Sequence, residues 1–213
     1  MEQKIEGKRR KYTIEACVES LPEAIYAEDH QADIIELCSE LSQDGLSPSL
    51  NLIEKIISRL KLPIKVMVRS RAGNFFYTQK ELESMIQYIQ DIQSLPIQGI
   101  VFGALREDYS LDIDGISLIA QYSELPITIH KCIDLTRQPL DEINKLKSIP
   151  QVHSILTSGC STSAMEGIPM IKQMITACED RLNLIVAGKV TPLNLEFLHA
   201  KIGANHYHGR RIV

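Results

Sequence analysis

The sequence predicts an α/β fold, a closed (β/α)8 barrel of the TIM type in which the eighth helix is absent. Three observations support this prediction. Short runs rich in β-branched residues alternate with longer amphipathic stretches along the whole chain. No linker rich in Gly, Pro or Ser divides the 213 residues, which fit a single domain, 1–213. Strict alternation implies parallel strands, and eight units in this length fit a closed barrel better than an open doubly wound sheet.

Eight segments have the length and the apolar, β-branched content of buried parallel strands. Pro63 and Pro126 stand directly before two of them, where each proline ends the preceding element. The predicted strands are residues 13–18, 33–37, 64–69, 99–103, 127–130, 152–157, 183–187 and 205–208.

The stretches between these strands carry apolar residues at the i, i+3, i+4 spacing of an amphipathic helix. Pro192 opens the last of them, after Thr191 in the cap position. The predicted helices are a segment after Leu21 and residues 50–60, 79–94, 115–122, 140–146, 165–178 and 193–200.

The printed chain ends just past the eighth predicted strand, so it offers no sequence for an eighth helix. Either the N-terminal segment, with 1–11 expected as a flexible arm, or a second subunit must cover that flank. A large apolar groove left exposed where the eighth helix would lie is rare on a monomer. We favour a partner subunit and therefore expect a homodimer or a higher homo-oligomer.

Composition excludes several classes of protein. The net charge of −4 argues against a nucleic-acid partner, and the basic run 8–11 has no interleaved aromatic residues. No stretch is apolar enough to span a membrane, and the N-terminus does not resemble a secretory signal. We therefore expect a cytoplasmic protein whose five cysteines are thiols.

Alternation along the predicted strands places several polar residues inside the barrel. On the first two strands these are Glu15 with Cys17 and Glu36 with Cys38, while Ile14, Ala16 and Val18 face the helices. The other inward pairs are Lys65 with Arg69 around Met67, Thr128 with His130, and His206 with His208.

Glu15, Glu36, Arg69, His130 and His208 fall near the C-terminal ends of strands, where barrel active sites are built. We expect the side chains of the first four to converge at that mouth, within hydrogen-bonding reach through direct or one-water contacts. The interpretation as a structural polar network stays open, but apolar side chains would fill a mere plug at lower cost, which favours a functional pocket.

Seven segments of the sequence form an ordered set: 15–20, 32–39, 45–49, 68–77, 101–104, 128–130 with Asp134, and 156–160. Through these segments the chain resembles the CutC family over nearly its whole length. Each segment is weak alone, but their order is specific. The resemblance implies a TIM-barrel fold, a cytoplasmic location and a link to copper tolerance, and Cys17 and Cys38 match the family's proposed copper ligands.

This chain also departs from the family pattern. His130-Lys-Cys-Ile-Asp134 replaces His-Arg-Ala-Phe-Asp, and residues 69–75 read Arg-Ser-Arg-Ala-Gly-Asn-Phe for Arg-Pro-Arg-Gly-Gly-Asp-Phe. The glycine-rich turn after the seventh strand is reduced to residues 187–189, and the family's extra C-terminal segment is missing. These changes weaken any shared catalytic role, and above all a phosphate site.

Two functions remain open. In the first, the chain handles copper, and Cys17 and Cys38 bind Cu(I), which soft thiolates select; Cys132 and Cys160 could add sulfur on the same rim. In the second, the chain is an enzyme for a small anionic molecule, with catalytic Glu15, Glu36, Arg69 and His130. The substrate-binding residues would then be Arg71, Asp134, Ser158, Gly159, Gly188 and His208.

Overall fold

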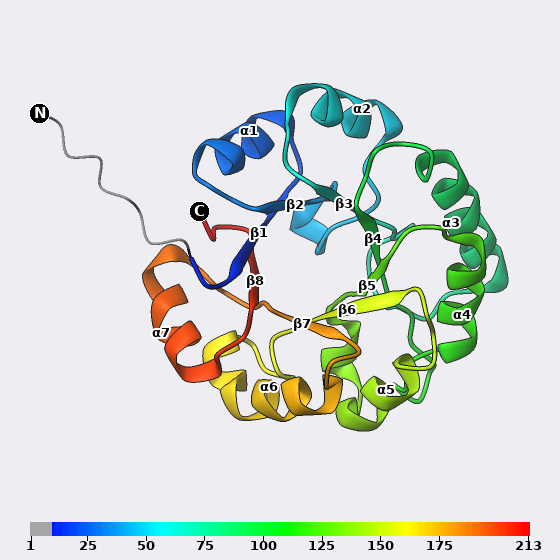
Figure 1. Cartoon of the computed structure of the whole chain (residues 1–213). Coiled ribbons are helices and arrows are strands. Elements are labelled where there is room, and N and C mark those ends of the chain that lie inside the picture. Colours follow the sequence, from blue (N-terminus) through cyan, green and yellow to red (C-terminus); the bar gives the residue numbers. More distant parts are fainter. Residues whose placement is uncertain (1–9) are drawn as a thin grey trace, which may run out of the picture.

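The computed structural model describes residues 10–213, which form a closed barrel of parallel strands inside a ring of helices (Figure 1). Each strand pairs in parallel with the next along the chain, and β8 pairs with β1. The predicted fold class is confirmed. The strands are β1 (Thr13–Val18), β2 (Ile34–Leu37), β3 (Ile64–Met67), β4 (Gly99–Phe102), β5 (Ile127–Ile129), β6 (Val152–Thr157), β7 (Asn183–Val186) and β8 (His206–Gly209).

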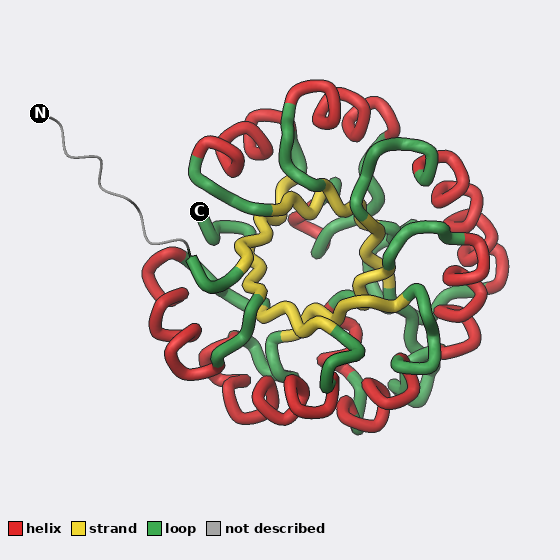
Figure 2. The backbone as a smooth tube through the Cα atoms, in the orientation of Figure 1, coloured by secondary structure: helices red, strands yellow, loops and turns green. Residues whose placement is uncertain are grey.

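Helices form the outer layer, one after each strand from β1 to β7 (Figure 2). Short polar side chains cap several N-termini; Ser20, Ser49 and Thr78, for example, each accept a backbone N–H of the first turn. None of the helices described is long and apolar enough to cross a membrane. The helices are α1 (Leu21–Asp29), α2 (Leu50–Arg59), α3 (Gln79–Ile92), α4 (Ile113–Tyr122), α5 (Pro139–Leu146), α6 (Ala164–Cys178) and α7 (Pro192–Ile202).

The loops at the C-terminal ends of the strands contain structure that the sequence pattern did not predict. Two short 3₁₀ helices, η1 (Leu41–Gln43) and η2 (Lys131–Leu135), follow β2 and β5. They are too short to produce a periodic apolar pattern. In addition, β3 ends at Met67, two residues before the predicted end of that strand. Both differences affect the candidate site.

The two faces of each strand differ as alternation predicts. Ile14, Ala16 and Val18 point outward into the large apolar core between barrel and helices. Inside the barrel, Cys17 and Cys38 belong to a small separate cluster with Met67 and Val101. The two thiols therefore pack against apolar side chains on one side, while the charged groups of the interior lie on the same inward faces of β1, β2, β3 and β8.

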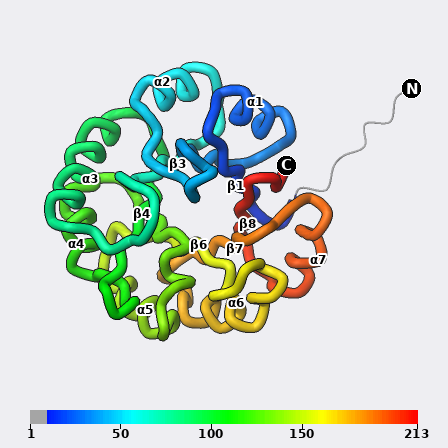
Figure 3. Tube along the Cα trace, turned by 180° about the vertical axis from the view of Figure 1, so that it is seen from behind, coloured from blue at the N-terminus to red at the C-terminus, as the bar shows by residue number. Residues whose placement is uncertain are grey.

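The flank that an eighth helix would cover lies between α7 and α1. Within residues 10–213 no helix follows β8, and the C-terminal segment lies in that part of the ring in both views (Figures 1 and 3). Tyr207 of β8 is nevertheless fully buried, because the Tyr12 ring lies 5.3 Å from its ring and Ile212 is buried nearby in the same core. The chain thus covers Tyr207 itself. Of the predicted arm 1–11, residues 1–9 lie outside the described residues.

Candidate functional site

Two thiols lie side by side at the C-terminal ends of β1 and β2. Cys17 is the penultimate residue of β1, and Cys38 directly follows β2. The register of these strands pairs Cys17 with Glu36, so the two sulfurs project into the barrel from adjacent strands. Their Sγ atoms are 3.9 Å apart, far beyond the ~2.05 Å of a disulfide. Both are buried free thiols.

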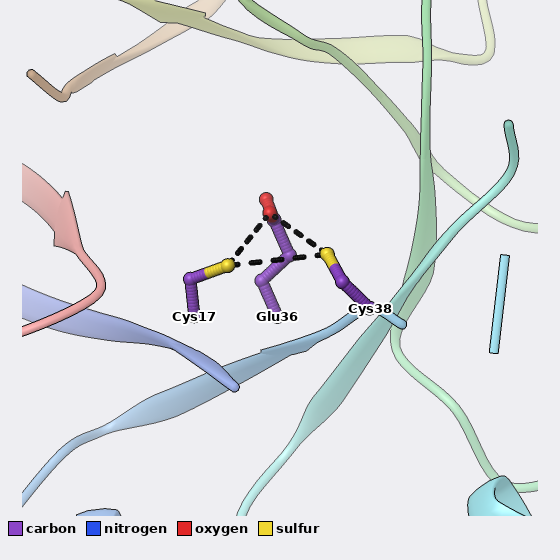
Figure 4. A group of neighbouring side chains, drawn as sticks. All are labelled: Cys17, Glu36 and Cys38. Atoms are coloured by element: carbon purple, nitrogen blue, oxygen red, sulfur yellow. Dashed lines mark hydrogen bonds between the residues drawn. The ribbon is translucent and has the colours of Figure 1, made fainter. Parts of the chain in front are cut away.

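The Glu36 carboxylate completes this group (Figure 4). Its Oε1 lies 3.6 Å from the Sγ of Cys17 and 3.6 Å from the Sγ of Cys38, and both thiols can donate to it. On the opposite side, His208 Nε2 of β8 lies 3.4 Å from the same oxygen. One carboxylate oxygen therefore stands between two sulfurs and an imidazole.

The environment makes the two thiols unequal. The hydrogen bond from Cys38 lowers the pKa of Cys17, and it outweighs burial and the charge of Glu36, which act in the opposite sense. The same contact, together with burial, raises the pKa of Cys38 well above its usual value. Burial opposes the charged form of His208, but Glu36 and Cys17 raise the pKa of this imidazole well above 6.5. Cys17 is thus the thiol that ionises first, beside an imidazolium.

Glu15 has a different set of partners, Lys65 and His206. Lys65 Nζ lies 2.6 Å and His206 Nε2 3.1 Å from the same oxygen, Glu15 Oε2. Burial alone would raise the pKa of Glu15, but His206 and Lys65 hold it at about 2. Lys65 and His206 also line a cavity of about 710 Å³ at the N-terminal ends of the strands. Glu15 is therefore an ionised, fully buried carboxylate below the thiol pair.

Arg69 does not join these carboxylates. Its guanidinium donates to the main-chain oxygens of Gln43, Asp44 and Gly45 at 3.0, 3.2 and 3.1 Å, and to that of Gly73 at 2.9 Å. Because β3 ends at Met67, Arg69 already lies in the loop region above the strand. The structure therefore separates Arg69 from the carboxylates with which we expected it to converge.

His130 is buried beside Arg69 rather than beside Glu15. Its Nδ1 accepts the N–H of Cys132 at 3.1 Å, and its ring centroid lies 4.7 Å from that of Phe75. Burial, and then the charge of Arg69, lower its pKa to about 4. His130 is therefore neutral near pH 7 and hydrogen-bonded to its own loop. The four expected catalytic residues do not form one hydrogen-bonded cluster in the described part of the chain.

The backbone amides of Ser158 and Gly159, expected to bind a substrate, are hydrogen-bonded within the chain. Asp134 Oδ2 accepts the N–H and the hydroxyl of Ser158, each at 2.8 Å, and its Oδ1 accepts the N–H of Cys160 at 3.0 Å. The N–H of Gly159 bonds to the hydroxyl of Thr157 at 2.8 Å. A carboxylate of the chain itself thus occupies the position that a phosphate would need.

The remaining predicted anion ligands are also engaged. Arg71 forms an ion pair with Glu81 and donates to the main-chain oxygens of Asn74 at 2.9 Å and Phe76 at 2.7 Å. Gly188 adopts φ +98°, and a Cβ there would lie 2.6 Å from the Cβ of Ser158. The close packing of the two turns therefore explains why residue 188 is a glycine.

The other predicted sulfur ligands lie elsewhere. Cys132 is packed in the outer core, and Cys160 is exposed in the loop after β6. Among residues 10–213 no thiol contact joins either of them to Cys17 and Cys38.

Sequence reasoning missed Lys65 and His206 as the partners of Glu15. The signal was present, since alternation placed Lys65 on the face of Met67 and His206 on the face of His208.

Comparison with known proteins gives one consistent result. A human copper homeostasis protein cutC homolog is 36% identical over 203 residues, 95% of this chain and 74% of that protein. A CutC family protein of Glaesserella parasuis is 34% identical over 86% of this chain and 75% of its own length. The crystal structure of a CutC protein from Streptococcus agalactiae superposes with a TM-score of 0.90 at 27% identity, covering 95% of this chain and all of that one.

More distant likenesses support the fold alone. Phosphoribosylanthranilate isomerase from Thermotoga maritima covers 93% of this chain and 86% of its own at 12% identity, with a TM-score of 0.55.

The family model named CutC family matches residues 12–213. The chain belongs to the CutC family.

Proposed function

We propose that this chain is a copper homeostasis protein that binds Cu(I) through Cys17 and Cys38. The observation that carries the proposal is the pair of free, buried sulfurs 3.9 Å apart. Thiolates are soft ligands that select Cu(I) over the hard cations of the cell. The relatives named as copper homeostasis proteins support the same function.

The spacing of the ligand atoms suits a shared ion. Two sulfurs that each lie about 2.3 Å from one ion, at trigonal angles, are about 4.0 Å apart. The observed 3.9 Å therefore needs little movement. Cys17 is the thiol that ionises first, and the proton of Cys38 has an acceptor in Glu36 Oε1, 3.6 Å away. A reducing compartment, which we expect to be the cytoplasm, would keep both thiols available.

The alternative, an enzyme for a small anionic molecule, has less support. Arg69 and Arg71 already bind main-chain oxygens and Glu81. Asp134 holds the amides of Ser158 and Cys160. These residues are positioned by contacts within the chain, so the thiol pair is the better basis for a function.

An anaerobic Cu(I) titration against a strong colorimetric chelator tests the proposal. We expect the native protein to withdraw one equivalent of Cu(I) from the chelator. The Cys17→Ser/Cys38→Ser variant should lose affinity by more than the roughly 10–100-fold that loss of an outer-sphere partner costs.

The matched control is Cys160→Ser/Cys178→Ser, which removes two thiols outside the pair and should bind as the native protein does. Equal Cu(I) affinity in the native protein and the Cys17→Ser/Cys38→Ser variant would overturn the proposal.

A further inference from the structure

A second group of metal-type ligands lies in the barrel next to the thiol pair. Glu15, Glu36 and His208 each offer one ligand atom, and these atoms all lie within 4.8 Å of one another. They come from three adjacent strands, because Glu15 of β1 is the direct partner of His208 in β8, while β2 carries Glu36.

Each of the three side chains has a buried polar atom without a hydrogen-bond partner. These atoms are Glu15 Oε1, Glu36 Oε2 and His208 Nε2. Lys65 and His206 both approach the other oxygen of Glu15, Oε2, and so leave Oε1 unpaired. His208 Nε2 is 3.4 Å from Glu36 Oε1 but makes no hydrogen bond to it. Buried groups of this kind are costly unless something pairs with them.

A cation between the three groups would pair with all of them. Glu15 is fully buried, and Glu36 is only 2% exposed. A single proton on the imidazole satisfies one hydrogen bond, whereas one metal ion can accept electron pairs from both carboxylates and the ring nitrogen. Lys65 compensates one of the two carboxylate charges, and a metal ion would replace the proton of His208 in compensating the other.

The kind of ion follows from the donors. Two carboxylate oxygens and one imidazole nitrogen suit a divalent transition metal ion, whereas the sulfur pair suits Cu(I). Ligand atoms about 2.1 Å from a tetrahedral ion lie about 3.4 Å apart, so groups now within 4.8 Å of one another need to close by at most about 1.4 Å. Cys17 and His208 retain 8% and 9% exposure, which places solvent at this part of the C-terminal mouth.

We propose that Glu15, Glu36 and His208 form a binding site for a divalent transition metal ion of the Zn²⁺ class, distinct from the thiol pair. Lys65 orients Glu15 by donating to its Oε2, and His206 Nε2 lies 3.1 Å from the same oxygen, so Oε1 stays free to bind the ion. Glu36 lies between the two sites, since its Oε1 contacts both thiols.

The test removes the thiols first, so that it is independent of Cu(I) binding. Metal-free Cys17→Ser/Cys38→Ser protein is titrated with Zn²⁺ against a chromophoric chelator, and the melting temperature is followed with and without Zn²⁺. We expect one equivalent of Zn²⁺ per chain and a higher melting temperature in its presence. Adding Glu15→Gln or, separately, His208→Gln should weaken Zn²⁺ binding at least about a hundredfold.

Glu142→Gln in the same background is the matched control, because Glu142 is a buried carboxylate that binds Lys145 and the Leu111 N–H outside this site. It should bind Zn²⁺ as its parent does. Glu15→Gln and His208→Gln are made separately and both are checked to be folded, so that unfolding is not mistaken for a loss of Zn²⁺ binding. Absence of Zn²⁺ binding in the thiol-free parent would overturn the proposal. Undiminished binding in both site variants would also overturn it, because the ion would then bind at other residues. Neither result bears on Cu(I) binding by the thiols.

Discussion

His130 and Glu15 are both buried, but their surroundings keep one neutral and the other ionised. Glu15 has Lys65 and His206 within 3.1 Å of one oxygen and is held ionised, with a pKa of about 2. His130 has no anion bonded to it and faces Arg69, so burial and that positive charge lower its pKa to about 4. Local pairing, rather than burial alone, therefore decides which interior groups are charged.

The first prediction is that buried His130 makes the free energy of unfolding decrease as the pH falls. Its folded pKa of about 4 lies below the unfolded value of 6.5, so the unfolded state takes up the proton first as the pH falls. The contribution of neutral His130 to the free energy of unfolding is fully present above pH 6.5 and is lost between pH 6.5 and 4. The loss should be about 3 kcal/mol in the free energy of unfolding, which urea titrations at a series of pH values would measure.

The His130→Gln variant isolates this effect, because it should lack the decline between pH 6.5 and 4 although its stability is lower throughout. The exposed His153 provides the control, and His153→Gln should follow the native profile. Glu15 adds a separate decline at lower pH, between about 4.5 and 2. Parallel profiles for the native protein and His130→Gln across the upper window would contradict the prediction.

The inward-facing residues of the site could be predicted from the sequence, but their partners could not. Alternation alone placed Cys17, Glu36 and His208 inside the barrel, because side-chain direction is a local property of a strand. Which cation meets Glu15 depends on where β3 ends. Lys65 lies within the strand and reaches Glu15, whereas Arg69 lies two residues beyond it.

At the scale of elements, the loop after β2 covers one of the two thiols. Residues 40–47 contain η1, whose Leu41 packs against the thiol cluster. A Cβ at Gly45 would lie 3.2 Å from Cys38 Sγ, and Cys38 has no exposed surface. Arg69 binds three carbonyl groups of this loop. The loop thus controls access to Cys38, and Arg69 holds it in place.

The second prediction is that Arg69→Ala opens this loop. Three main-chain oxygens of the loop and that of Gly73 would lose charge-assisted hydrogen bonds, which should lower the free energy of unfolding by about 2–4 kcal/mol. Cys38 should then react with a thiol reagent at least about ten times faster, because loop opening costs less free energy. Urea titration and mass-spectrometric labelling of Cys38 measure the two effects.

Arg71→Ala is the matched control for this experiment. Arg71 lies two residues further along, is partly exposed, and binds Glu81 and the segment 72–76 rather than the loop over Cys38. It should leave Cys38 labelling unchanged. If both variants label Cys38 at the native rate, the loop is held by contacts other than those of Arg69.

At the scale of the whole molecule, the barrel was predictable because closure follows from repetition. Seven similar strand–helix units followed by an eighth strand, with a consistent apolar period, leave few other arrangements of parallel strands. The η1 and η2 segments were not predictable in this way, since distant parts of the chain hold them. Glu19 and Arg69 bind η1, and Asp134 of η2 binds the amides of Ser158 and Cys160. The ends of the strands, where function is built, are therefore the part of the fold that sequence patterns describe least well.

The last prediction concerns assembly through the flank between α7 and α1. Tyr207 is covered by the chain itself, but Leu193 and Phe197, four residues apart on α7, are 98% and 50% exposed, and Tyr26 on α1 is 53% exposed. Residues at this spacing share one helix face, and a second copy of the chain would bury it. We expect the native protein to sediment as a dimer or larger at micromolar concentration. Leu193→Glu/Phe197→Glu should sediment as the 24.0 kDa monomer, whereas Tyr122→Glu on α4 should not change the assembly. A native protein that sediments only at the monomer mass would show that this face has no partner copy.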